Sequence, residues 1–129
     1  MFNRKIVRKA LKRTWESVDC SACSAKKSAI DKSSMTSQLI YDVFGGKILK
    51  ICKKKGWHFY NRIEGEPVDF TVSEMNNYFP DNNSKGQPAT PEETRNYFAQ
   101  EDYLNFYMRF INSFEEIVGL KKYRRRNLA

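Results

Sequence analysis

The hydrophobic periodicity of the chain changes at Gly45-Gly46, and this change constrains the fold more than any other feature of the sequence. Before the two glycines, apolar residues recur at the three- and four-residue spacing of a helix, whereas residues 47–52 alternate like a strand. Consecutive glycines readily adopt the left-handed conformation that ends a helix. The sequence therefore predicts a helix that begins near Ser33, ends at Phe44 and leads directly into a strand. The apolar positions of this helix are Met35, Leu39, Ile40 and Val43.

Two further turn signals predict an antiparallel meander. Residues 53–56 form the first turn, and residues 57–63 are rich in the aromatic and branched side chains that favour strands. A second turn around residues 64–67 returns the chain into a third strand at residues 68–71. Three consecutive strands joined by such short turns pair as antiparallel neighbours.

Helices are predicted before and after these strands. An amphipathic pattern covers residues 4–16, and a capping box opens a short helix that starts at Thr71 and ends near Tyr78. Residues 80–91 have the composition of a loop, although Thr90-Pro91 marks the start of another short helix.

A long final helix is predicted over residues 101–118, with Gly119 as its stop. The fold class is therefore α+β, with N-terminal helices packed on a small antiparallel sheet and a C-terminal helix. We expect one domain over residues 1–120, followed by a basic tail at residues 121–129. The expected buried positions of the final helix are Leu104, Tyr107, Met108, Ile111, Phe114 and Val118.

Composition excludes several classes of protein. Charged residues interrupt every apolar run well short of the roughly 20 residues that span a bilayer, so neither a membrane span nor a signal peptide is predicted. We therefore expect a cytoplasmic chain whose cysteines stay reduced. Cys20 and Cys23 form a C-x-x-C, but only Cys52 and His58 remain to complete a zinc site. Neither a metal nor a cofactor is predicted.

The net charge of +8 is unevenly distributed. Residues 47–62 carry six Lys or Arg and no acidic residue, whereas residues 64–118 carry eleven acidic residues and three basic ones. Such a distribution can steer a protein toward an anionic partner, but basic runs of this kind are typical of solvated tails and helix faces. Because no nucleic-acid reading motif accompanies the basic residues, nucleic-acid binding is not favoured.

His58 is the only histidine of the chain, and it lies on a predicted strand. Asp69 follows eleven residues later on the next strand of the same hairpin. If residues 62–65 form the loop, the two residues face each other directly; if Gly65-Glu66 is a tight turn, they lie two pairs apart on a common face. A carboxylate beside an imidazole fixes its tautomer and leaves the other ring nitrogen to act on a nucleophile or substrate.

Ser33 and Ser34 lie where the second predicted helix starts. Backbone amides and partial positive charge at a helix start favour an anion, an environment that suits a cysteine thiolate better than a serine hydroxyl. Spacing alone leaves two interpretations of Ser33 open. It is a nucleophile served by His58, or it is a helix cap.

Several segments resemble the YunG-like family of small bacterial proteins. They are Ser33-Ser34-Met35-Thr36-Ser37, Tyr41-Asp42-Val43-Phe44-Gly45-Gly46, His58-Phe59-Tyr60-Asn61-Arg62 and Val68-Asp69-Phe70-Thr71, with looser similarity across about residues 10–118. The resemblance implies a papain-like or transglutaminase-like fold with a Cys-His-Asp order along the chain. It aligns the family's cysteine, histidine and aspartate with Ser33, His58 and Asp69 of this chain.

The serine at position 33 admits three explanations: an engineered replacement of a native cysteine, a natural serine enzyme, or a natural pseudoenzyme. The resemblance implies acyl chemistry on an amide, by hydrolysis, deamidation or acyl transfer, with Ser33, His58 and Asp69 as catalytic residues. The substrate would be a peptide, a protein or a small amide. The alternative is a non-catalytic binding module of the same fold, which uses its cleft or its basic surface to hold a partner. The expected substrate-binding residues are Trp57, Asn61 and Ser34.

Overall fold

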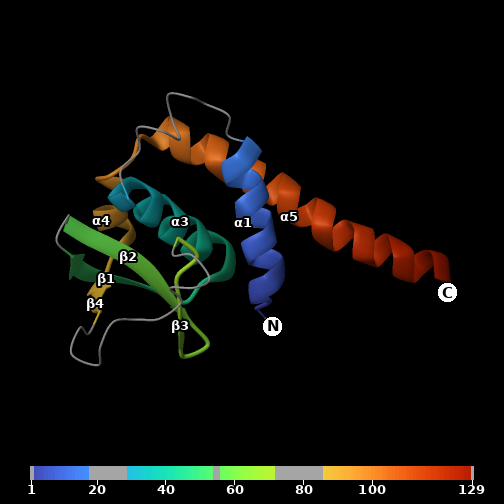
Figure 1. The fold of residues 1–129 in the computed structure, drawn as a ribbon, viewed down its shortest axis with the longest axis horizontal. Helices are drawn as coiled ribbons and strands as arrows, with labels where there is room; N and C mark the ends of the chain where they lie inside the picture. The colour runs from blue at the N-terminus through green and yellow to red at the C-terminus, as the bar shows by residue number, and fades with distance from the viewer. Residues whose placement is uncertain (1, 18–28, 54–55, 72–85, 129) are drawn as a thin grey trace. The chain divides into compact units, whose positions relative to one another are not determined.

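The computed structural model describes residues 2–17, 29–53, 56–71 and 86–128 (Figure 1). The chain divides into two compact units, one of residues 27–100 and the other of residues 1–26 with 101–129. Each unit is described separately below. The short helix predicted at residues 71–78 and the Cys20-x-x-Cys23 pair fall largely or wholly outside the described residues.

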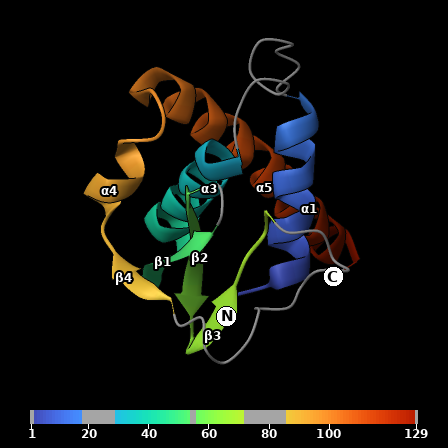
Figure 2. The same cartoon turned by 60° about the vertical axis from the view of Figure 1, so that its left-hand side comes forward.

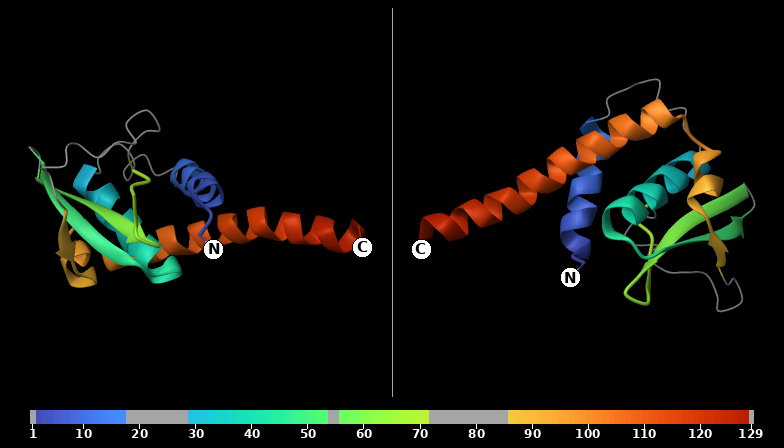
Figure 3. Two further views of the ribbon diagram at one scale, coloured as in Figure 1. Left: turned by 90° about the horizontal axis from the view of Figure 1, so that it is seen from below. Right: turned by 180° about the vertical axis from the view of Figure 1, so that it is seen from behind.

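The unit of residues 27–100 consists of one helix against a small sheet. Helix α3 (Ala29–Phe44) precedes strands β1 (Lys47–Lys53), β2 (Gly56–Ile63) and β3 (Glu66–Val68), which form the predicted meander. The sheet has the order β3-β2-β1-β4, and every neighbouring pair of strands is antiparallel. Helix α3 packs against β2, as Figures 2 and 3 show. The predicted α+β class with a small antiparallel sheet is confirmed.

The fourth strand corrects the prediction of a continuous loop over residues 80–91. Strand β4 (Gln87–Ala89) pairs with β1 at the sheet edge and runs into the short helix α4 (Pro91–Arg95). Its sequence, Gln-Pro-Ala, has no branched or aromatic residue and carries a proline, which is tolerated at a sheet edge. Tertiary pairing with β1, rather than local propensity, therefore makes this segment a strand. The start of α4 is as predicted, with a complete capping box between Thr90 and Glu93.

The β2–β3 pairing differs by two residues from both predicted registers, which pair Asn61 with Glu66 or with Phe70. The two central residues of the turn are Glu64 and Gly65, both with positive φ, at 53° and 81°. Positive φ at both central positions is typical of the tight turn whose twist matches that of a hairpin. The resulting register pairs Asn61 with Val68 and Ile63 with Glu66. Val68 ends β3, so the predicted strand at residues 68–71 is shifted toward the turn.

Helix α3 ends at Phe44 as predicted, but it begins at Ala29, one turn before Ser33. Gly45 and Gly46 follow with φ angles of 83° and 81°. A Cβ atom on Gly46 would lie 2.5 Å from the Arg62 carbonyl oxygen, whereas one on Gly45 would have nothing within 4 Å. Gly46 thus lets the chain turn from α3 into β1 close against the backbone of β2.

The other unit pairs helix α1 (Arg4–Ser17) with helix α5 (Gln100–Leu128). The rings of Trp15 and Phe106 lie 4.5 Å apart between centroids and join the two helices. Over residues 100–119 of α5, the buried positions are Tyr103, Phe106, Phe110 and Ile117. No described helix is both long and apolar enough to cross a bilayer.

Two predictions for α5 are wrong. Leu104 and Met108, expected in the buried stripe, are 53% and 59% exposed. Aromatic and aliphatic residues occur on more than one side of this helix, so spacing alone allows two apolar stripes. The helix also continues through Gly119 to Leu128, because a glycine in a helix interior costs only about 1 kcal/mol and does not by itself end the helix.

Candidate functional site

Strand β2 sends its side chains alternately to two faces of the sheet. His58 and Tyr60 point to one face, and Phe59 and Asn61 point to the other, because successive side chains of a strand alternate. Asn61 lies on the side of α3, where its Nδ2 donates a hydrogen bond to the Ser37 carbonyl oxygen over 3.0 Å. The His58 side chain therefore lies on the face of the sheet opposite the side chains of Trp57 and Phe59.

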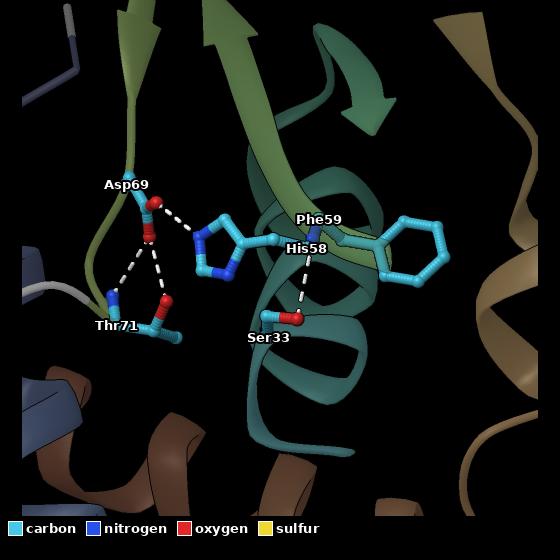
Figure 4. A network of polar contacts seen from close by, with 5 residues as sticks. All are labelled: Ser33, His58, Phe59, Asp69 and Thr71. Atoms are coloured by element: carbon cyan, nitrogen blue, oxygen red, sulfur yellow. Dashed lines mark hydrogen bonds and ion pairs between the residues drawn. The ribbon is translucent and has the colours of Figure 1, made fainter. Parts of the chain in front are cut away.

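His58 and Asp69 are hydrogen-bonded through Nε2 of the ring and Oδ2 of the carboxylate (Figure 4). Asp69 directly follows β3, and continuing the register by one residue places it opposite Tyr60. Diagonal neighbours of this kind remain within reach of a long side chain. The side chains of His58 and Asp69 are 14% and 7% exposed, so the pair is largely removed from solvent.

The second oxygen of Asp69 is held by Thr71. The backbone N–H of Thr71 donates to Asp69 Oδ1 over 3.0 Å, and the Thr71 hydroxyl donates to the same oxygen over 2.7 Å. Burial alone would raise the pKa of Asp69, but the hydrogen bonds from His58 and Thr71 and the attraction of His58 hold that pKa below its usual value. Asp69 is therefore ionised at neutral pH and accepts hydrogen bonds at both oxygens.

Thr71 is a member of the site that the sequence analysis missed. An aspartate that accepts from the backbone N–H two residues later forms a common local turn, and a threonine at that position can add its hydroxyl. The Asp-x-Thr spacing at Asp69 was the available signal. It was interpreted as part of a third strand instead.

Ser33 is the fifth residue of α3, fully buried, and its Oγ accepts a hydrogen bond from the Phe59 backbone N–H over 3.2 Å. The predicted position of Ser33 at the start of the helix is therefore wrong: it is neither the cap nor among the first free amides. Its role as a nucleophile stays a prediction. Residues 29–32 form the first turn of the helix, ahead of Ser33. The N–H group that donates to the Ser33 side chain is therefore that of Phe59 on β2, and not one at the start of a helix.

The relation between Ser33 and His58 is indirect. Among the described residues, Asp69 is the hydrogen-bond partner found for His58, and the hydroxyl oxygen of Ser33 accepts from the Phe59 backbone N–H (Figure 4). In Figure 4, the edge of the His58 ring that carries Nδ1 is turned toward Ser33. Since Nε2 donates its hydrogen to the carboxylate, a neutral His58 has an unprotonated Nδ1 that can accept a proton.

The remaining predicted residues have different surroundings. Ser34 is fully buried in α3, and Asn61 is 2% exposed. Trp57 lies near the start of β2, where it pairs with Cys52 of β1. Lys50 Nζ lies 4.6 Å from the centroid of the Trp57 ring, and Lys50 also forms an ion pair with Glu93. A role for these three residues in substrate binding stays a prediction.

In the described part of the chain, no group of three His, Cys, Asp or Glu side chains is placed to hold a metal ion.

Comparison with known proteins finds a family model, described as YunG protein, that matches residues 3–114. The chain is also 33% identical over 69 residues to the uncharacterized protein YunG of Bacillus subtilis (strain 168). This alignment covers 54% of the chain and 60% of the Bacillus protein, so it spans less than two thirds of that relative. No solved structure matches the chain.

Proposed function

The chain belongs to the YunG family, and we propose that it carries a papain-like or transglutaminase-like site for acyl chemistry on amides. In this proposal residue 33 occupies the nucleophile position that a cysteine takes in the family pattern, His58 carries the proton and Asp69 orients His58. The observation that supports the proposal is the continuous hydrogen-bond chain from Thr71 through Asp69 to His58, on the strand whose next residue binds Ser33.

The chemistry starts with attack of the residue 33 hydroxyl on the carbonyl carbon of an amide, as its proton passes to Nδ1 of His58. The carbon–nitrogen bond then breaks, and the amine leaves with that proton, so that the acyl group remains as an ester on Ser33. Water, deprotonated at the same nitrogen, attacks this ester; the bond from the acyl carbon to Ser33 Oγ breaks, and that oxygen takes back the proton from Nδ1 as the acid leaves. An amine in place of water gives acyl transfer.

Asp69 and Thr71 make this proton transfer more favourable. An ionised carboxylate at Nε2 stabilises the imidazolium that forms when Nδ1 takes the proton. The two bonds from Thr71 keep the carboxylate in place while the charge of His58 changes. For the transfer itself, the Ser33 hydroxyl must come within hydrogen-bond distance of Nδ1 and point its hydrogen at that nitrogen.

The experiment that tests the proposal is a thiol titration. We would prepare Ser33→Cys with the three native cysteines changed to serine, with and without His58→Ala, and follow ionisation of the single thiol by its ultraviolet absorbance. This readout does not depend on reagent access to a buried side chain. A thiol that ionises well below the usual pKa of about 8.5, and loses this property without His58, supports a thiolate–imidazolium pair. A thiol with an ordinary pKa that His58→Ala leaves unchanged contradicts the proposal.

The second candidate is a non-catalytic binding module or pseudoenzyme of the same fold. It is favoured by the burial of Ser33 and by the engagement of its hydroxyl oxygen with the Phe59 amide, which are features of a side chain that joins two elements. Such a protein would bind an amide or anionic partner without turnover. Partner binding that persists in a folded His58→Ala variant, together with an ordinary thiol titration, would favour this candidate.

A further inference from the structure

Two hydrogen bonds link α3 to β2. The Phe59 backbone N–H donates to Ser33 Oγ over 3.2 Å, and Asn61 Nδ2 donates to the Ser37 carbonyl oxygen over 3.0 Å. Their helix residues are four apart, and their strand residues are two apart. Both bonds therefore join one face of the helix to the same short stretch of the strand.

The spacing of the two bonds matches on both elements. Four residues of a helix rise about 6 Å, and two residues of a strand advance about 6.6 Å. The donors on β2 and the acceptors on α3 can thus be satisfied together only when the helix is in one longitudinal register against the strand. A displacement of α3 by one residue along its axis, about 1.5 Å, would strain or break both bonds.

Asn61 makes its hydrogen bond through a buried side chain. The side chain is 2% exposed, so an Nδ2 group without an acceptor would lose hydration with no compensation. A carbonyl inside a helix can accept a second hydrogen bond, because its oxygen has two lone pairs. Asn61 therefore uses the Ser37 carbonyl without displacing a helical hydrogen bond.

We propose that Asn61 is a positioning residue: by binding the Ser37 carbonyl, it holds α3 in the register that keeps residue 33 at the Phe59 amide, beside the strand that carries His58. Its importance for catalysis rests on the function proposed above, whereas its effect on the placement of Ser33 does not. Asn61 thereby acts through the backbone of α3 and needs no contact with substrate.

The first test measures hydrogen exchange at the Phe59 amide in the chain with its own Ser33. Asn61→Leu removes the donor at nearly constant volume, and Asn61→Ala serves as a second variant if the first does not fold. After correction for any change in global stability, exchange at Phe59 should become about 5- to 30-fold faster. The Leu49 and Ile51 amides of β1 should change only as far as global stability does. A corrected Phe59 rate equal to that of the wild type overturns the inference.

Gln38→Leu is the matched control. Gln38 is also buried on α3, but its side chain binds Asp42 on α3 and Thr94 on α4, so it fixes no contact with β2. Its loss should lower stability without a selective change at Phe59. Selective loss of Phe59 protection in this control as well would assign the effect to general loosening of α3, against a role particular to Asn61.

The second test separates the inference from the proposed function. In the single-thiol Ser33→Cys protein, Asn61→Leu should raise the thiol pKa toward about 8.5, whereas Gln38→Leu should leave it unchanged. A low, His58-dependent pKa that Asn61→Leu does not alter contradicts only the positioning role. An ordinary pKa that His58 does not influence contradicts the proposed function, and the exchange rate at Phe59 then decides the role of Asn61.

Discussion

His58 and Asp69 meet diagonally across the β2–β3 hairpin. Asp69 lies opposite Tyr60 when the observed register is continued, so its carboxylate reaches back by one alternate position to the His58 ring. Thr71 holds the other carboxylate oxygen and thereby determines which oxygen faces His58. The turn of two residues at Glu64-Gly65 makes this contact diagonal and keeps both side chains on one face. A slip of one residue in the β2–β3 pairing would send Asp69 to the opposite face.

Ionisation of Asp69 should make stability depend on pH. The folded-state pKa of Asp69 lies below the unfolded value of about 3.9, because hydrogen bonds from His58 and Thr71 outweigh burial. The ionised group therefore stabilises the fold above about pH 4, and this contribution disappears as pH falls through the folded-state pKa. The difference in unfolding free energy between wild type and Asp69→Asn should be largest near neutral pH and shrink on acidification. Urea unfolding at several pH values measures it, and a difference independent of pH would contradict the assignment.

Loss of the Thr71 hydroxyl should weaken the anchoring of Asp69. Thr71→Val keeps the backbone N–H but removes the hydroxyl donor, and a hydrogen bond to a charged group contributes about 1.5–3 kcal/mol. We expect a loss of stability at neutral pH near the lower end of that range, since Thr71 is partly exposed. Thr71→Ser retains the donor and should lose much less. Equal losses in the two variants, measured by urea unfolding, would show that the hydroxyl bond contributes nothing.

The two glycines after α3 should respond differently to alanine. Both have φ angles near 80°, which cost a residue with a side chain about 1–2 kcal/mol. Only Gly46 also lacks space, because its Cβ would lie 2.5 Å from the Arg62 carbonyl oxygen. Gly46→Ala should therefore destabilise the protein clearly more than Gly45→Ala in thermal or urea unfolding. A larger loss for Gly45→Ala would show that the close approach to Arg62 is relieved easily.

The capping box of α4 should contribute to its stability. The Thr90 side chain accepts from the Glu93 backbone N–H, and the Glu93 carboxylate accepts from the Thr90 backbone N–H. Thr90→Ala should cost about 1 kcal/mol, whereas Thr90→Ser keeps the hydroxyl and most of the stability. Urea unfolding of the two variants measures the difference. Equal stability of the two variants would show that the Thr90 hydroxyl does not stabilise α4.

Local signals predicted several elements correctly. The helical spacing before Gly45 and the alternation after Gly46 predicted the end of α3 and the start of β1, since both depend on neighbouring residues. The resemblance to the YunG family was confirmed by the family match over residues 3–114. Hairpin geometry also predicted that His58 and Asp69 share a face, and their hydrogen bond confirms it.

Long-range packing decided what local signals could not. A turn around residues 64–67 allowed several registers, and only pairing across the sheet selected the one that places His58 diagonal to Asp69. Likewise β4 is a strand because it pairs with the edge of β1, and packing rather than spacing decides which side of α5 is buried.

The sequence by itself determined the succession from α3 into the β1–β3 meander, the common face of His58 and Asp69, and the family, because these depend on residue type and short spacing. The tertiary structure decided that Ser33 lies within α3, with its hydroxyl at the Phe59 amide, and that Asn61 joins the helix to the strand. These contacts join residues 24 and 26 positions apart, and their geometry is set by how a helix rise and a strand advance match when the two elements pack.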